Sequence, residues 1–212
     1  MSRQLLKWLR WLAPGVLFYL LTLPLVPILP SWLSLNVSLG FSVFELPIAA
    51  LIFASIYDIT GIRLHSNEKF HSRIKSNIED RLWSIARSPA ARPSAWTDRV
   101  ARDVFYKLVD NDNSLTARSE IIYFNGFLWT TSADLRAVSL MIFMLSLGML
   151  LAAPSNNTVL TALVINAAAF ALSFLISEAL TRRHISLGDE QLDYIETHLK
   201  SELSTKIASL GV

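Results

Sequence analysis

The chain has 212 residues, of which 52% are hydrophobic, and its mean hydropathy is +0.42. The apolar residues are gathered in long blocks, which excludes an ordinary water-soluble fold and favours a bilayer as the solvent. The formal net charge is only +2. The chain contains no cysteine, which excludes disulfide bonds, thiolate metal sites and a cysteine nucleophile.

Four of the apolar blocks are long enough to cross about 30 Å of hydrocarbon, since a helix rises about 1.5 Å per residue. They comprise residues 11–29, 39–57, 135–153 and 160–180. Glu45 is the acidic residue well inside these blocks. Asp58, Arg136 and Glu178 lie at or near block ends, where polar side chains can reach the headgroups. The sequence therefore predicts an all-α membrane protein with four transmembrane helices.

The basic residues are distributed one-sidedly among the segments that join these blocks. All 19 fall before the first block, between the second block and the start of the third, or after the fourth, and the connections 30–38 and 154–159 contain none. By the positive-inside rule, this distribution places both termini and the middle segment in the cytoplasm. We therefore predict a multi-pass protein of the inner (plasma) membrane.

The middle segment is predicted to form a small, mainly helical cytoplasmic domain over residues 61–134. Apolar spacing predicts helices over about 67–87 and 94–109, the second capped by Ser94. Residues 121–129 are apolar and aromatic, which is compatible with a short hairpin or an interfacial element. A domain of this size buries too small a fraction of its surface to be stable by itself. We therefore expect it to pack against another part of the structure.

The C-terminal segment, residues 181–212, is predicted to be a cytoplasmic amphipathic helix that begins with Asp189 as its cap. Its apolar stripe includes Leu192, Ile195, Leu199, Leu203 and Ile207. A one-sided helix needs a partner surface. That surface could be the middle domain, another copy of the chain or a soluble cytoplasmic protein, and we take these five residues as candidate partner-docking residues. Residues 1–60 likewise begin with a basic segment that we expect in the membrane interface.

A polar layer is predicted within the membrane around Glu45. Counted inward from the outer ends of their blocks, Glu45, Thr22, Ser146 and Asn166 lie at similar depth. A carboxylate there is costly unless it is paired, neutralised or close to water. The layer could hold the helices together through hydrogen bonds, or it could line an ion or proton route, as in a channel or transporter.

Small residues indicate where membrane helices approach closely. Ala167 and Ala171 form a small-xxx-small pair in the fourth block, and Gly148 lies in the third. The helix that they contact could be in the same chain or in a second copy of it. We expect a homo-oligomer. In the first block, Pro24, Pro27 and Pro30 are expected to end the helix near the outer surface, and the alternative is a broken helix that lines a transport site.

The sequence contains no motif that predicts an enzyme. Phosphate-binding glycine-rich loops, nucleophile elbows and zinc-protease helices are absent. Asp110, Asp112 and Ser114 match the start of a calcium loop, but Leu115 and Ile121 occupy the positions that need Gly and Glu. We therefore expect no cofactor or metal, and the modest positive charge of the middle segment suits lipid headgroups better than nucleic acid.

The sequence thus favours a non-enzymatic membrane protein that oligomerises through its transmembrane bundle and docks a soluble cytoplasmic partner, as a sensor, scaffold or anchor. The alternative is a channel or transporter that uses the layer around Glu45. Several kinds of compact membrane protein share this layout, including membrane subunits of bacterial defence systems. A layout without motifs is an analogy only.

Overall fold

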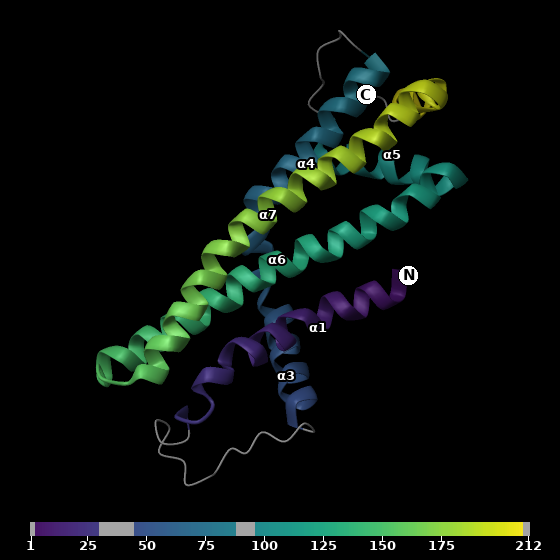
Figure 1. Ribbon diagram of the computed structural model, residues 1–212. Helices are drawn as coiled ribbons and strands as arrows, with labels where there is room; N and C mark the ends of the chain where they lie inside the picture. Colours follow the sequence, from purple (N-terminus) through teal and green to yellow (C-terminus); the bar gives the residue numbers. More distant parts are fainter. Residues whose placement is uncertain (1–2, 30–44, 88–95, 210–212) are drawn as a thin grey trace. The chain divides into compact units, whose positions relative to one another are not determined.

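The computed structural model describes residues 3–29, 45–87 and 96–209, and within these ranges every regular element is a helix (Figure 1). The elements in chain order are α1 (Arg3–Thr22), η1 (Leu23–Leu25), α3 (Glu45–Thr60), α4 (Ile62–Arg87), α5 (Asp98–Asn111), α6 (Asn113–Ala152), α7 (Asn157–His198) and α8 (Lys200–Ser209). The predicted all-α class is confirmed for the described residues.

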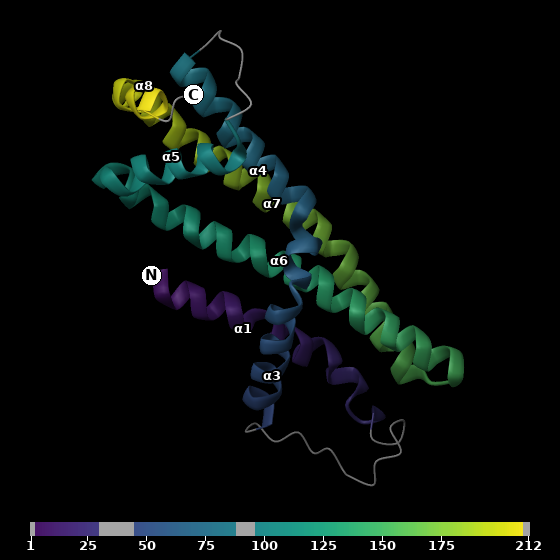
Figure 2. The ribbon, with the colours of Figure 1, turned by 180° about the vertical axis from the view of Figure 1, so that it is seen from behind.

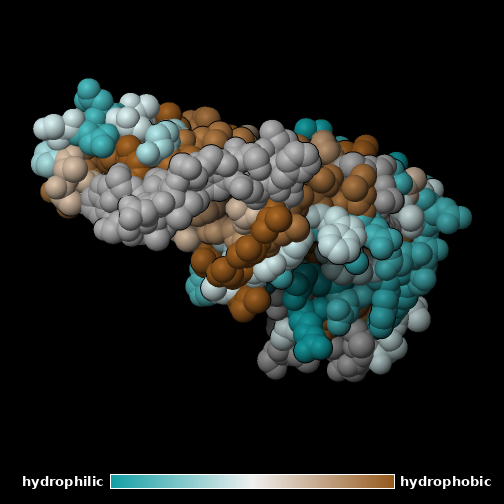
Figure 3. Space-filling model, turned by 90° about the horizontal axis from the view of Figure 1, so that it is seen from below, coloured by the Kyte–Doolittle hydropathy of each residue, from teal (hydrophilic) through white to brown (hydrophobic). Residues whose placement is uncertain are grey.

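The chain divides into two compact units, and three helices contribute residues to both. Residues 2–67 and 127–177 form one, which we call the apolar unit, and residues 68–126 and 178–212 belong to the other, the polar unit. Among the described residues, 26 large apolar side chains are exposed, and 23 of them belong to the apolar unit. Hydrophobic and hydrophilic residues accordingly gather on different parts of the surface (Figure 3). A largely apolar exterior is what a hydrocarbon environment favours.

Three helical segments in the described ranges are long and apolar enough to cross a membrane, namely Gln4–Leu25, Asn113–Ala152 and Asn157–His198. A fourth candidate arises if the bent pair Ile48–Thr60 and Ile62–Ala86, which meet at 60°, is counted as one span. These findings agree with a membrane protein of three or four spans. With 40 and 42 residues, α6 and α7 are each about 60 Å long, about twice the thickness of the hydrocarbon core.

The exposed apolar residues of α6 and α7 mark the parts of these helices that suit lipid. On α6 they begin at Leu140 and continue to Leu151, and on α7 they run from Leu160 to Leu175. These stretches lie inside the predicted blocks 135–153 and 160–180. Residues 113–126 of α6 and 178–198 of α7 belong to the polar unit.

Within the apolar unit, α1 and α3 cross in close contact, as both ribbon views show (Figures 1 and 2). Gly15 lies directly against the main chain of Ala50, so that a Cβ atom at this position would be 1.9 Å from the Ala50 carbonyl oxygen. The rings of Phe18 and Phe53 stack beside this contact, with centroids 3.9 Å apart. A glycine facing an alanine lets two helix backbones approach, as membrane helices commonly do.

The ends of α1 and α3 follow from local sequence. The α-helix of α1 stops at Thr22 and continues as the 3₁₀ turn η1, which contains Pro24, in agreement with the expectation that prolines end this helix. At the other boundary, Gly61 has a φ of 65°. This left-handed conformation suits glycine and closes α3 before α4 begins at Ile62.

The polar unit has a hydrophobic core of its own. The core contains residues from α4, α5, the start of α6, the end of α7, and α8. Trp83 and Trp96 pack with ring centroids 5.4 Å apart, and Leu82, Leu108 and Leu115 are almost completely buried. The expectation that the middle segment needs a further surface is met, because the C-terminal residues complete this core.

Several predicted element boundaries were wrong. Residues 121–129 are part of the continuous helix α6, so they form neither a hairpin nor a separate interfacial element. Asp189 does not cap a new helix, because α7 runs through Gly188 to His198. The cap of α5 is Thr97, whose hydroxyl accepts a hydrogen bond from the Val100 amide, while Ser94 lies outside the described residues. The predicted boundaries at 134 and 180 therefore fall inside unbroken helices.

Candidate functional site

The most connected polar site of the apolar unit is an ion pair between Arg63 of α4 and Asp134 of α6. Arg63 Nε donates to Asp134 Oδ1 at 2.7 Å, and Arg63 Nη2 donates to Oδ2 at 2.9 Å. The Asp134 side chain is 0% exposed and that of Arg63 is 20% exposed. A two-pronged guanidinium–carboxylate contact fixes both distance and orientation, which matters where little water can compensate for lost contacts.

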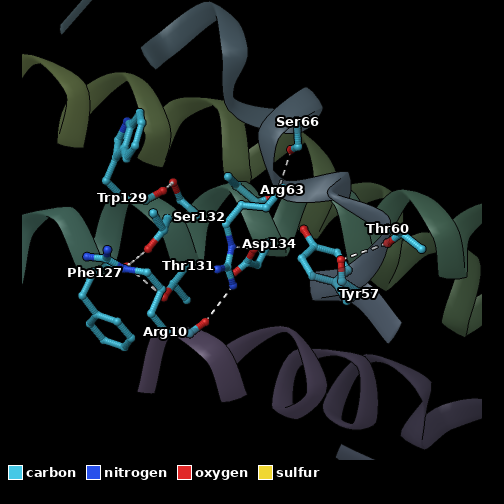
Figure 4. Close-up of polar contacts among 12 residues, drawn as sticks. Arg10, Tyr57, Thr60, Arg63, Ser66, Phe127, Trp129, Thr131, Ser132 and Asp134 are labelled. Carbon is cyan, nitrogen blue, oxygen red and sulfur yellow. Dashed lines mark hydrogen bonds and ion pairs between the residues drawn. The ribbon is translucent and has the colours of Figure 1, made fainter. Parts of the chain in front are cut away.

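Arg63 also connects this pair to α1 and α3. Its Nη2 donates to the main-chain carbonyl oxygen of Arg10 at 2.7 Å (Figure 4). The guanidinium carbon lies 5.8 Å from the centroid of the Tyr57 ring, within the range of a cation–π contact. One arginine therefore contacts α1, α3 and α6 from its position at the start of α4.

A second arginine, Arg136, makes the corresponding contacts with α4 and α7. Its guanidinium donates to the Ser66 carbonyl oxygen and to the Ser177 hydroxyl, and it lies 4.5 Å from the centroid of the Phe174 ring. Only 6% of Arg136 is exposed. The residue therefore points into the bundle, whereas its place near a block end had suggested contact with headgroups.

Together these residues form a network that joins α1, α3, α4, α6 and α7. Further hydrogen bonds support it: the Ser66 hydroxyl donates to the Ala133 carbonyl oxygen at 2.9 Å, and the hydroxyls of Ser132 and Ser177 are 2.8 Å apart. Among the residues in ranges 3–29, 45–87 and 96–209, no group of three or more acidic or histidine side chains could hold a metal ion. The hydrogen bonds of this geometry suit it to fixing the helices against one another. Because the arginines outnumber the carboxylate, the network also attracts an anion.

The predicted polar layer is only partly visible. The side chain of Glu45 lies outside the described residues. Thr22, Ser146 and Asn166 are all buried, but each bonds to main-chain carbonyl oxygens and not to the others. Asn166 Nδ2 is also 3.4 Å from the Leu21 carbonyl oxygen on α1. The bonds of Thr22 and Ser146 are within their own helices, so among these contacts only that of Asn166 with Leu21 joins two helices. The role of the layer, and of Glu45 in it, stays a prediction.

The small residues predicted to pack membrane helices lie on the outside of the apolar unit. Ala167, Ala171 and Gly148 are exposed, and a Cβ at Gly148 would have no heavy atom of the described chain within 4 Å. The inward positions belong to Ala162 and Val159 instead, so these small residues do not belong to the core of the unit. Contact with a second copy stays a prediction.

The predicted docking stripe is buried inside the polar unit. Leu192, Ile195, Leu203 and Ile207 are each 0% exposed, and Leu199 packs against the same core. Of the alternatives considered for this stripe, packing on the middle domain is the arrangement that the structure adopts. A partner cannot reach the four fully buried side chains in this conformation, and Leu199 is only partly exposed, so the stripe does not form an accessible docking surface.

Polar contacts outside the core also fasten α7 to α4. Arg73 forms an ion pair with Glu178 at 2.6 Å, Asn77 donates to Asp189 at 2.9 Å, and Arg81 pairs with Asp193 at 2.5 Å. The spacing is four residues along α4 at each step, which places these side chains on one face of the helix. Asp189, which was predicted to be a helix cap, is thus a contact between helices.

Sequence reasoning missed the network around Arg63 and Asp134. Both residues were assigned to the cytoplasmic segment because they lie just outside the apolar blocks. The available signal was that Asp134 and Arg136 flank the start of a long apolar run, where a buried charge requires a partner of opposite sign. The partner on α4 could not be identified, since its position depends on the bend at Gly61.

Comparisons with family models, with curated proteins and with solved structures find no match to this chain. The class of the protein is defined by its own structure, namely by its helices, its apolar exterior and its buried ionic network. It is an all-α protein with three or four helices suited to cross a membrane.

Proposed function

We propose that this protein is a non-enzymatic, multi-pass protein of the inner membrane that oligomerises through its bundle and docks a soluble cytoplasmic protein. The observation that carries the proposal is the division of its exterior: 23 of 26 exposed large apolar side chains belong to the apolar unit. A chain with this division keeps one unit in lipid and offers the other to water. The one-sided distribution of basic residues supports four crossings with both termini in the cytoplasm.

Contact between copies is proposed to involve the outer faces of α6 and α7. Gly148, Ala167 and Ala171 are exposed there. Small side chains on the lipid-facing side of a helix allow the backbone of a neighbouring helix to come close, which favours association through packing and weak main-chain contacts.

The docking surface is proposed to lie on α6, since the stripe at the C-terminus is occupied by the core. Three large apolar side chains are exposed among the described residues of the polar unit, namely Tyr106, Ile121 and Phe124. Ile121 is 54% exposed and Phe124 is 45% exposed. They are three residues apart on one helix and therefore share a face. An exposed aliphatic–aromatic pair in an otherwise polar exterior is typical of a protein contact.

The proposal is tested by purifying the tagged full chain from its native membranes in mild detergent and quantifying associated proteins. The variant Ile121→Glu is expected to lose a partner that copurifies with the wild type in a fixed ratio. Ala208→Glu, at an exposed position of α8 in the same unit, is the matched control and should keep it. Retention of the partner by Ile121→Glu, or the absence of any partner in fixed ratio from the wild type, would refute docking at this surface.

A further inference from the structure

Arg10 differs from the other arginines of the buried network because its guanidinium has no hydrogen-bond acceptor among the described residues. Its main-chain carbonyl oxygen accepts the bond from Arg63, but its side chain makes no hydrogen bond with the described residues, and Nε is enclosed without a partner. The residue is half-buried, and its terminal nitrogens, unlike Nε, are not enclosed. Arg10 therefore presents two terminal nitrogens that make no hydrogen bond with the described residues of the chain.

The charges around Arg10 do not neutralise it. Arg63 and Asp134 both lie close enough to act on its guanidinium, in opposite senses. Because Arg63 holds both carboxylate oxygens of Asp134, these two residues form a nearly neutral pair. Arg10 is left as the surplus cation of the three. A partly enclosed guanidinium without an acceptor is unfavourable, and an anion from outside the chain would remove that penalty.

The neighbours of Arg10 on α1 suit the depth of lipid headgroups. Trp8 is 63% exposed and packs edge-on against Trp11, with ring centroids 6.0 Å apart. Exposed tryptophans concentrate at the boundary between hydrocarbon and headgroups. Lys7, three residues before Arg10, is also exposed and lies on the same face of the helix. Two cations beside interfacial aromatic rings thus occur at one level of α1.

We propose that Arg10 binds the phosphate group of an anionic phospholipid, with Lys7 as a second cationic contact. The inference rests on the proposed membrane location of the apolar unit. The planar guanidinium suits a phosphate, whose oxygens accept two parallel hydrogen bonds. The proposed lipid site is in the N-terminal segment, which the distribution of basic residues assigns to the cytoplasmic side. Anionic lipids of the cytoplasmic leaflet attract basic segments. Arg63 acts as a positioning residue, because it holds the main chain of Arg10.

The test measures lipid retained by the purified full chain, using native mass spectrometry with phosphatidylglycerol and phosphatidylcholine of the same acyl composition. The wild type is expected to retain phosphatidylglycerol preferentially, and Arg10→Gln to lower that preference about tenfold, as expected for one charge-assisted contact. Arg10→Lys keeps the charge without the planar fork and should be intermediate. Arg99→Gln, which removes an exposed arginine of α5 in the polar unit, should retain the preference.

Each substitution at Arg10 leaves the contact with Arg63 in place, since that contact uses the main-chain carbonyl oxygen. A monodisperse profile in size-exclusion chromatography confirms that the variants are folded. An unchanged preference in folded Arg10→Gln, or no preference in the wild type, overturns the inference. Complete displacement of phosphatidylglycerol by millimolar inorganic phosphate would overturn the assignment to a lipid and indicate a site for free anions.

The membrane proposal is checked separately by extracting cell membranes with alkaline carbonate. A wild-type chain that leaves the membrane refutes the proposed location and this inference with it. A chain that stays in the membrane but shows no preference for the anionic lipid refutes the lipid site alone.

Discussion

At the scale of single residues, the apolar unit depends on how its buried charges are paired. Asp134 is completely buried, and both of its oxygens accept bonds from one arginine. Such a pair contributes little compared with well-packed apolar side chains, but removal of one partner leaves the other charge without compensation. Arg63 also donates to the main-chain carbonyl oxygen of Arg10, so loss of the carboxylate would leave Arg63 unopposed close to a second arginine.

We predict that Asp134→Asn lowers the free energy of unfolding by about 3–5 kcal/mol, because Arg63 would remain enclosed without a counterion. Denaturation of the purified chain in detergent measures the change. The control is Glu202→Gln, which removes a 44% exposed carboxylate from a surface pair with Lys206 and should cost less than about 1 kcal/mol. Equal effects of the two substitutions would show that the buried pair does not stabilise the unit.

At the scale of helices, the contact of α1 with α3 depends on the absence of a side chain at Gly15. We predict that Gly15→Ala destabilises the chain by about 1–3 kcal/mol, since the new Cβ would overlap the Ala50 carbonyl oxygen and push the helices apart. Thermal unfolding in detergent measures this change. Alanine otherwise favours helix formation, so the steric effect opposes a propensity gain of about 0.8–1 kcal/mol.

Gly188→Ala is the matched control for Gly15→Ala. Gly188 is inside α7, and a Cβ there would have no heavy atom of the described chain within 4 Å. This substitution should therefore be neutral or stabilising. If Gly15→Ala proves as stable as Gly188→Ala, the close approach of α1 to α3 is not a feature of the folded chain.

The sequence predicted helices and their apolar faces better than it predicted where helices end. Leu82, Leu108 and Ile195 are core residues whose spacing of three or four along their helices could be recognised directly. The path of α7 through Gly188 could not, because glycine is common at helix ends and costs only about 1 kcal/mol inside one. Tertiary contacts such as Asn77 to Asp189 can offset that cost, and a single sequence does not display them.

The candidate site was the part least accessible from sequence. Apolar blocks identify the helices that suit a membrane, but the contact of Arg63 with Asp134 joins residues 71 positions apart. Long-range pairs of this kind depend on how the helices cross, here on the bend at Gly61 and the close approach at Gly15. The docking stripe failed as a prediction of an accessible surface for the same reason, since one-sidedness of a helix does not identify its partner.

At the scale of the whole molecule, the proposed arrangement has two environments linked by continuous helices. Helices α6 and α7 each supply residues to the apolar unit and to the polar unit. Removal of the residues after 188 would take Leu192, Ile195, Leu203 and Ile207 out of the core of the polar unit. Deletion of this segment is therefore expected to unfold that unit, so single substitutions on its surface are the informative way to study docking.

The four-crossing topology can be tested cleanly because the chain contains no cysteine. We predict that a cysteine at Ser155, in the exposed connection between α6 and α7, reacts with a membrane-impermeant maleimide added to intact spheroplasts. A cysteine at Glu196, exposed on the part of α7 in the polar unit, should react only after the membrane is opened. The physical reason is the positive-inside rule, which keeps the arginine-rich and lysine-rich segments in the cytoplasm.

The control for reactivity is labelling of both variants in detergent, where the two positions should react to a similar extent because both side chains are exposed. Labelling of Glu196→Cys in intact spheroplasts would contradict the proposed orientation, because it would place this part of α7 outside the cytoplasm. Labelling of both positions from the same side would mean that α7 does not cross the membrane, since one crossing separates Ser155 from Glu196 in the proposed topology.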